Sequence, residues 1–355
     1  MQISPDADSL IESSASRILA AHCSAEQLKA TEGKWSEALW RDLDEAGFTR
    51  ALEPPGGEMA IPIAEALQIA RVAGRYCAPA PLVETLLAHW LLASVGLTAT
   101  PGPMTIAPAV TGDDLRLERT LEGWRLTGSA TRVPWGRYAR CAVVVAKSSD
   151  KWHLARLPAS SLGAVTPGEN LAREPRDTIK LDAAVKPDAV RPYPMGLEHI
   201  HGLGAGLRVL QMAGALDSVL SLTVEYAQTR NQFGRPIGKF QAVQQNIAVL
   251  AAQVAAARAA ANLTIDIIAR GGSRFGLAAA KLRTNEAATI AARMAHQVHG
   301  AMGFAQEYAL HSFTRRLWSW RDEFGSESTW GWILGSAVRR RGSRGVWAFI
   351  TSEMG

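Results

Sequence analysis

The first candidate functional residue is an arginine that lies directly before a predicted turn. Arg230 precedes Gly234 and Pro236, which permit a tight turn and pre-set the backbone of a following helix. Its guanidinium fork would project near a helix junction, where it can bind an anion through two parallel hydrogen bonds. The alternative is an ordinary arginine on the surface or in a salt bridge between helices.

Two histidines, His296 and His299, stand three residues apart in the last third of the chain. A helix with this spacing could turn both rings toward one metal ion. No carboxylate or cysteine pattern nearby completes a ligand set, so we predict no metal site. Gly300 follows the pair and allows a backbone amide to approach a ligand closely.

The composition is that of a folded protein. The chain has 355 residues, of which 47% are hydrophobic and 20% charged, which excludes global disorder and allows one large or two to three small domains. The formal net charge of +5 could attract a phosphorylated cofactor. It is too small and too local to indicate nucleic-acid binding.

The three cysteines are Cys23, Cys77 and Cys141, and they lie far apart with no C-x-x-C spacing. This argues against a disulfide framework and a cysteine zinc site, and it fits a reducing compartment. The N-terminus lacks the charged and apolar regions of a secretory signal, and the longest apolar stretches fall short of the about 20 residues that cross a bilayer. We therefore expect a cytoplasmic protein with no membrane span.

The elements that must position these residues fall into three segments. Residues 1–98 predict a helical N-terminal domain, with Leu39, Trp40 and Leu43 on an apolar stripe that ends at Gly47. Helical spacing returns over residues 61–73 and 82–97, separated by the loop signals 53–57, Pro79 and Pro81.

Residues 99–196 predict a small antiparallel, barrel-like β domain. Turn residues punctuate short runs of strand type, which are 115–118, 123–127, 142–146 and 152–157. Residues 197–355 return to long amphipathic, alanine-rich runs and predict a C-terminal four-helix bundle. The fold class is thus mostly α with a central β domain.

Two motifs in the last segment resemble those of the acyl-CoA dehydrogenase family. The first is the stretch 226–241, Y-A-Q-T-R-N-Q-F-G-R-P-I-G-K-F-Q, and the second is Q-V-H-G-A-M-G-F at 297–304, followed by Glu307-Tyr308. The N-terminal stretch 74–81, G-R-Y-C-A-P-A-P, resembles a landmark of the same family. The resemblance spans the whole chain and agrees with its α, β, α order.

The resemblance implies an FAD site built across a subunit boundary, hence an oligomer. It places Arg230 on the pyrophosphate of FAD, with the flavin nucleotide contacted by Gln232, Phe233, Phe240, Gln241, Gln297, Val298, His299, Gly300 and Ala301, and it places Ser326 at a further FAD contact. Ala301 stands where the family usually has a second glycine. Phe240, taken alone, would be a core residue.

The β domain matches the family's flavin-facing segments less well. Residues 104–113 are the candidate for a loop that lies along the flavin, but the loop's usual acidic residue is absent. Trp135 falls where the family places a residue near the flavin ring, and its alternative is a plain core position.

The catalytic carboxylate expected from the resemblance is missing from both of its habitual positions. One position lies directly before a glycine and about 17 residues after the E-Y pair, where this chain has Phe324 before Gly325. The other lies 26 residues before Arg230 and is Gly204. Glu323, one residue early, is the remaining candidate base; its alternative is a solvated acidic pair with Asp322. A one-residue shift on a helix rotates a side chain by about 100°.

The resemblance implies an FAD-dependent oxidoreductase that carries out α,β-dehydrogenation of an acyl-CoA thioester and passes electrons to an external acceptor. Its oligomer would be a dimer or tetramer, homomeric or mixed. One alternative is a non-catalytic subunit that completes the FAD site of a homologous dehydrogenase, as in mixed oligomers acting on ring-bearing thioesters. The other is a flavin oxidase of the same fold, for which Asp322 could be the base.

Overall fold

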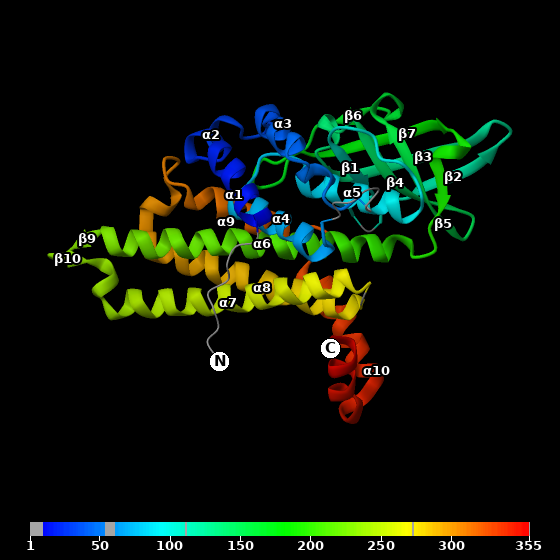
Figure 1. The fold of residues 1–355 in the computed structure, drawn as a ribbon. Coiled ribbons are helices and arrows are strands. Elements are labelled where there is room, and N and C mark those ends of the chain that lie inside the picture. The colour runs from blue at the N-terminus through cyan, green and yellow to red at the C-terminus, as the bar shows by residue number, and fades with distance from the viewer. Residues whose placement is uncertain (1–9, 54–60, 111, 272, 355) are drawn as a thin grey trace.

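A computed structural model describes residues 10–53, 61–110, 112–271 and 273–354. Most of the predicted loop at 53–57 lies outside these residues. Three layers follow one another along the chain: N-terminal helices, a β domain and a long helical bundle (Figure 1).

Within residues 10–53 and 61–98, the N-terminal layer contains five α-helices: α1 (Leu10–His22), α2 (Ala25–Ala30), α3 (Glu37–Glu45), α4 (Ile63–Arg75) and α5 (Leu82–Ser94). The stripe of Leu39, Trp40 and Leu43 is buried, as its spacing predicts. Gly47 follows α3 with φ of 78°, a conformation that glycine adopts without strain. The short helix α2 was not predicted from the sequence.

The described residues of the β domain form one eight-stranded mixed sheet. Its strands are β1 (Met104–Ala107), β2 (Leu115–Thr120), β3 (Gly123–Pro134), β4 (Cys141–Ser148), β5 (Lys151–Pro158), β6 (Val165–Thr166), β7 (Arg176–Val185) and β8 (Val190–Pro192). The order is β6-β7-β3-β2-β4-β5-β8, and β1 pairs with β4. The expected antiparallel pairing needs a correction, because β1 and β2 each meet β4 in parallel.

Four helices form the bundle: α6 (Gly196–Thr229), α7 (Gln241–Ala269), α8 (Arg274–His299) and α9 (Leu310–Asp322). Helices α6, α7 and α8 pack against one another, and α9 packs on α6 and α8. A hairpin of β9 (Asn231–Gln232) and β10 (Arg235–Pro236) joins α6 to α7 at the end of the bundle far from the sheet, and α10 (Glu327–Met354) projects from the other end (Figure 1).

Two glycines bring the first and third layers into close contact. A Cβ atom on Gly74 of α4 would lie 1.9 Å from the carbonyl oxygen of Gln211 in α6. A Cβ atom on Gly214 of α6 would lie 1.9 Å from the carbonyl oxygen of Arg71. The backbones of α4 and α6 therefore touch directly, and any larger side chain at either position would force them apart.

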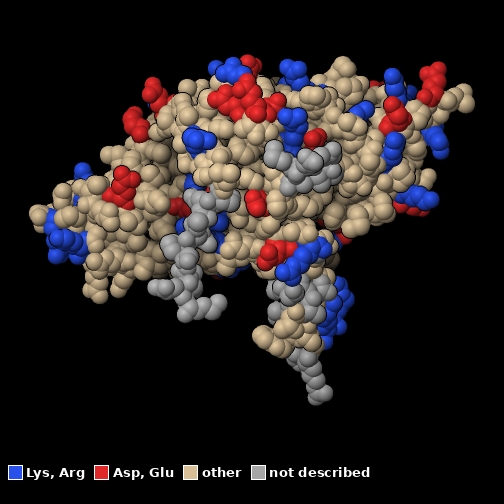
Figure 2. All heavy atoms as spheres, viewed as in Figure 1, with Lys and Arg blue, Asp and Glu red and all other residues tan. Residues whose placement is uncertain are grey.

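The expectation that every apolar stretch is too short for a bilayer is wrong for α6 and α7. Both helices are long and apolar enough by length and composition alone. The apolar window of α6 is 72% buried inside the protein, as in a core helix, whereas that of α7 is 33% buried. Helix α7 thus leaves an apolar face on the bundle surface, where charged side chains are sparse (Figure 2).

Candidate active site

A cavity of about 320 Å³ lies where the sheet, α6 and the turn between α9 and α10 meet. The loop after β1, the end of β3 and helix α6 form one side, and the α9–α10 turn forms the other. The lining residues are Ala109, Val110, Arg132, Pro134, His201, Asp322, Glu323, Phe324, Gly325, Ser326 and Thr329.

The two vacant base positions face each other beside this cavity. A Cβ atom on Gly204 would lie 2.4 Å from Cδ1 of Phe324, so the phenylalanine ring occupies the space that a side chain at position 204 would need. Phe324 is 7% exposed and has φ of 53°, an unusual conformation for a bulky residue. The ring therefore fills one habitual position and blocks the other.

Glu323 turns its carboxylate toward two buried arginines. Arg176 donates from Nε to Oε1 at 2.7 Å, and Arg208 donates from Nε to Oε2 at 2.8 Å. Burial alone would raise the pKa of Glu323, but the two guanidinium groups outweigh it and hold this pKa at about 2. A carboxylate that binds protons this weakly and has both oxygens occupied is a poor general base, which argues against the predicted role of Glu323.

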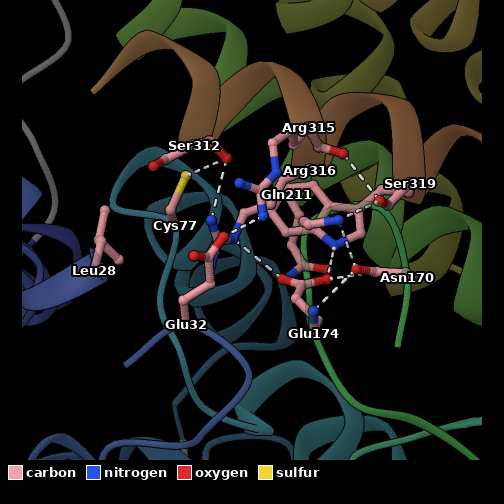
Figure 3. Close-up of polar contacts among 12 residues, drawn as sticks. Leu28, Glu32, Cys77, Asn170, Glu174, Gln211, Ser312, Arg315, Arg316 and Ser319 are labelled. Atoms are coloured by element: carbon pink, nitrogen blue, oxygen red, sulfur yellow. Dashed lines mark hydrogen bonds and ion pairs between the residues drawn. The ribbon is translucent and has the colours of Figure 1, made fainter. Parts of the chain in front are cut away.

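The same ion-pair network extends through all three layers. Arg208 of α6 also donates to Glu84 of α5 at 2.5 Å. In the loop before β7, Glu174 accepts hydrogen bonds from Arg176 at 3.0 Å and from Arg316 of α9 at 3.2 Å. Figure 3 shows Glu174 and Asn170 beside each other, both facing α9 with its Arg316 and Ser319. Three carboxylates and three guanidinium groups thus fix the α9–α10 turn to the rest of the chain.

Asp322 and Ser326 flank the turn on its solvent side. The side chain of Asp322 is 56% exposed and lies 3.9 Å from Arg321, so it matches the predicted solvated acid. Ser326 precedes α10, and its hydroxyl lies 2.8 Å from that of Ser328. Both residues line the cavity, and neither is held in the buried ion-pair network.

Apart from Ser326, the residues predicted to contact FAD lie at the opposite end of α6 from the cavity. Arg230, Gln232 and Phe233 occupy the exposed hairpin, where Phe233 is 91% exposed, and Gln241 begins α7. Phe240 packs edge-on against Phe233 with 6.1 Å between the ring centroids. Lysine and arginine side chains gather at this end (Figure 2). In the described part of the chain, the Arg230 guanidinium forms no ion pair.

The second predicted group ends α8 beside this hairpin. Gln297 and Ala301 are exposed, while Val298 and His299 are buried. His299 stacks on Tyr226 of α6 with a centroid distance of 4.4 Å, which ties the end of α8 to the turn of α6 that precedes Arg230. Gly300 has φ of 59° and open space where a Cβ would stand, so a ligand can approach its backbone.

Helix α6 separates the cavity from this predicted FAD end. It is a continuous helix of 34 residues. At 1.5 Å per residue, the 26 positions between Gly204 and Arg230 correspond to about 39 Å. One chain therefore cannot bring both groups to the same reacting atoms, although two chains side by side could. The unpaired Arg230, the exposed Phe233 and the open Gly300 suit the phosphates and aromatic base of a dinucleotide that comes from outside the chain.

Trp135 lies next to the cavity without lining it. It is 3% exposed, has φ of 55° and packs against Tyr138 with 6.3 Å between the ring centroids. Its neighbour Pro134 does line the cavity. Trp135 thus has the surroundings of a core residue, at the place where the sheet approaches the site.

His201 is a cavity residue that the motif analysis missed. It is 7% exposed, and its Nε2 atom is buried with no hydrogen-bond partner. A signal was present in the sequence, because His201 precedes Gly204 by three residues and so lies on the same helix face. The ion-pair network was also missed. Its partners are far apart in sequence, as Glu84 and Arg208 are separated by 124 positions.

Comparisons with known proteins agree with this architecture. Residues 203–327 match the family described as "Acyl-CoA dehydrogenase, C-terminal domain". The acyl-CoA dehydrogenase IpdE2 of Mycobacterium tuberculosis is 27% identical over 88% of this chain and 91% of its own length. The acyl-CoA dehydrogenase FadE27 of the same organism is 28% identical over 81% of this chain and 84% of its own length.

Solved structures with the same fold cover nearly the whole chain. The ChsE4-ChsE5 complex from Mycobacterium tuberculosis matches with a TM-score of 0.79 at 22% identity, over 95% of this chain and 98% of that chain. The Tcur3481-Tcur3483 steroid acyl-CoA dehydrogenase matches with a TM-score of 0.84 at 24% identity, over 93% of this chain and 97% of that chain. Residues 203–327 thus match the C-terminal domain of acyl-CoA dehydrogenases, and the chain as a whole is similar to proteins of that family.

Proposed function

We propose that the protein is an FAD-dependent oxidoreductase that dehydrogenates an acyl-CoA thioester between its α and β carbons, in an oligomer of at least two chains. The observation that carries the proposal is that the cavity lies at one end of α6 and the Arg230 hairpin at the other. The Gly204 side of the cavity and Arg230 lie about 39 Å apart on one chain, at 1.5 Å per helical residue. Neighbouring chains can join the cavity of one to the Arg230 end of the other.

In this arrangement Arg230 binds the pyrophosphate of FAD, and Gln297 to Ala301 offer backbone and side-chain contacts to the nucleotide. Arg230 suits this role because its exposed fork can form two parallel, charge-assisted hydrogen bonds. Ser326 is the further FAD contact, at the cavity end of the neighbouring chain. The flavin, when bound, supplies the acceptor for the β hydride.

The chain's own residues at the cavity position the thioester and limit access of water. Arg132 places a positive charge on the cavity wall, which favours a substrate with an anionic CoA moiety. The ion pairs of Glu323 hold the α9–α10 turn rigid, so that Phe324 and Gly325 stay in place against α6. This rigidity favours a fixed orientation of the reacting carbons.

We further propose a cytoplasmic protein that passes electrons from reduced FAD to an external acceptor. The three cysteines are unpaired, which supports a reducing compartment. Ring-bearing acyl-CoA thioesters are the first substrates to test, because a structural neighbour is described as a steroid acyl-CoA dehydrogenase.

FAD binding tests the cofactor part of the proposal. Arg230→Gln should weaken FAD affinity by about 10- to 100-fold, since a hydrogen bond to a charged group contributes about 1.5–3 kcal/mol. Equilibrium dialysis with FAD measures the affinity. Arg235→Gln is the matched control, because Arg235 lies on the same hairpin but stacks on the Phe240 ring at 4.3 Å. Equal loss in both variants would contradict the role of Arg230.

A second candidate function is a non-catalytic subunit that completes the FAD site of a homologous dehydrogenase. The observation that favours it is the loss of all three carboxylate options, because Phe324 and Gly204 are not acids and Glu323 is ion-paired. The protein purified alone, loaded with FAD and mixed anaerobically with acyl-CoA thioesters, separates the two functions. Bleaching of the flavin absorption supports a catalyst, whereas bleaching only after a homologous chain is added supports the partner role.

A further inference from the structure

Two carboxylates line the cavity of the site described above, and neither is placed to remove the α proton of a thioester. Glu323 is ion-paired with two buried arginines, and Asp322 is a 56% exposed, solvated acid beside Arg321. Dehydrogenation needs a group that accepts this proton at the cavity. The described residues that line it include His201, whose imidazole ring is a general base of the kind that enzymes use most often.

We propose that His201 is the proton acceptor of this site and replaces the family carboxylate through its Nε2 atom. The inference rests on the proposed function. In the step itself, the α C–H bond breaks, the proton passes to Nε2, and the electron pair of that bond stays on the substrate, delocalised into the thioester carbonyl.

The position of His201 carries the first part of the argument. It lies one helical turn before Gly204, on the face of α6 that would present a glutamate at that position. The His201 ring lies 6.2 Å from the Phe324 ring, in an edge-on arrangement. His201 therefore borders the spot where the two habitual base positions meet, while the phenylalanine ring closes the positions themselves.

The unpartnered nitrogen carries the second part. Buried polar atoms in folded proteins almost always have a hydrogen-bond partner, so an orphan atom needs an explanation. Nε2 of His201 is buried and has no partner in the described structure, although the residue lines a cavity large enough for a small ligand. A substrate that brings a proton to this atom would satisfy it.

The charge state of the ring supports the same role. Burial lowers the pKa of His201 and favours the neutral ring, while the nearby Pro108 backbone acts in the opposite direction. A neutral ring has a lone pair available for a proton at neutral pH. The charged groups that surround it or share the cavity are Arg132, Arg274, Asp113, Glu198, Asp322 and Glu323.

Exchange of the α proton with D2O tests the proposal without any oxidation. Arylacetyl-CoA thioesters suit this purpose because they carry acidic α hydrogens but have no hydrogen-bearing saturated β carbon, so they cannot be dehydrogenated. The FAD-loaded protein should catalyse deuterium uptake at the α carbon, measured by mass spectrometry. General base catalysis contributes about 10²- to 10⁴-fold, so His201→Ala should slow this exchange at least 100-fold.

Two variants separate a base from a structural residue. His201→Gln keeps a polar side chain of similar size, and it should lose exchange while its thioester dissociation constant changes less than about threefold. Added imidazole should partly restore exchange to His201→Ala. His199→Gln is the matched control, because His199 lies on the same helix but is hydrogen-bonded to the Tyr193 hydroxyl at 2.6 Å and does not line the cavity. It should exchange at the wild-type rate.

The dependence on pH gives a further readout. Exchange by the wild-type protein should fall as the pH drops through a midpoint below the ordinary histidine value, because protonation removes the lone pair of Nε2. The same profile should be absent from both His201 variants. A midpoint that persists in His201→Gln would assign the titration to another group and overturn the proposal.

The remaining outcomes are distinct. Unchanged exchange in His201→Ala overturns the role of His201 and leaves the proposed function standing. A wild-type protein that binds FAD and thioesters without exchanging the α proton also overturns it and favours a base from a homologous chain. A wild-type protein that binds neither FAD nor thioesters overturns the proposed function as well.

Discussion

The two ends of α6 differ in how far their side chains are packed and ion-paired within the chain itself. At the Gly204 end, the ring of Phe324 fills the space over the glycine and Glu323 is neutralised by two buried arginines. At the Arg230 end, a guanidinium group and the Phe233 ring point into solvent. The first end is stabilised by contacts within one chain. The second end presents a charged and an aromatic side chain that are exposed on the described chain. Such side chains are suited to contact a ligand or a neighbouring chain.

The largest effect on stability should come from disrupting the Glu323 ion pairs at the Gly204 end of α6. Glu323→Gln would remove the carboxylate that Arg176 and Arg208 share, leaving each buried arginine with a single acidic partner, and breaking a buried ion pair costs about 3–5 kcal/mol. We expect a loss of this size in the free energy of unfolding, measured by urea denaturation. Asp322→Asn changes an exposed neighbour and should cost less than about 0.5 kcal/mol. A similar stability for both variants would contradict the ion-pair network.

Acid should expose the same dependence in the wild-type protein. The pKa of Glu323 lies near 2 in the folded chain, below its usual value of 4.5, so its ionised form is favoured by folding. This contribution to stability is complete above the ordinary carboxylate pKa and is lost as the pH falls toward 2. Urea midpoints from pH 5 to pH 2 should drop more steeply for wild type than for Glu323→Gln. Parallel curves would show that another carboxylate dominates.

A smaller effect is expected from Gly204→Ala. The new methyl group would meet the Phe324 ring at 2.4 Å, and overpacking a core contact costs about 1–3 kcal/mol. Phe324→Leu should relieve part of this cost, so the double variant should be more stable than the sum of the single changes indicates. A thermodynamic double-mutant cycle measures this coupling. Strict additivity would mean that the two positions do not touch.

The smallest effect on stability should come from the exposed end. Phe233→Ser removes a ring that is 91% exposed, so the unfolding free energy of the isolated chain should change by less than about 0.5 kcal/mol. If this end is completed by FAD or a neighbouring chain, the same change should still weaken FAD retention or oligomer formation, measured by absorbance and light scattering. A large loss of stability in the isolated chain would erase the contrast between the two ends.

The sequence predicted local features well because they depend on neighbouring residues. The stripe of Leu39, Trp40 and Leu43 predicts the buried face of α3, and Gly47 marks its end. Strand β7 and the parallel pairing of β1 with β4 were not predicted, because strand order depends on contacts between distant segments.

The candidate site shows the same limit. Motif spacing identified Gly204 and Phe324 as vacant base positions, but only the structure shows that one side chain fills both. Glu323 looked like a displaced base since sequence cannot show which way a carboxylate points. Its partner Arg176 is 147 positions away, too far for any local pattern to reveal. His201 could not be selected from the sequence, because only the structure shows that its Nε2 atom lacks a hydrogen-bond partner and that the residue lines a cavity.

The contact between Phe324 and Gly204 also determines the order in which substitutions at these two positions can be made. A glutamate at position 204 cannot fit while the Phe324 ring stands 2.4 Å from its Cβ site, so that replacement must wait until position 324 has become smaller. A glutamate at position 324 has no such prerequisite, because its neighbour at 204 has no side chain. Of the two habitual acids, one therefore needs a change at its own position alone, whereas the other also needs a smaller residue at position 324.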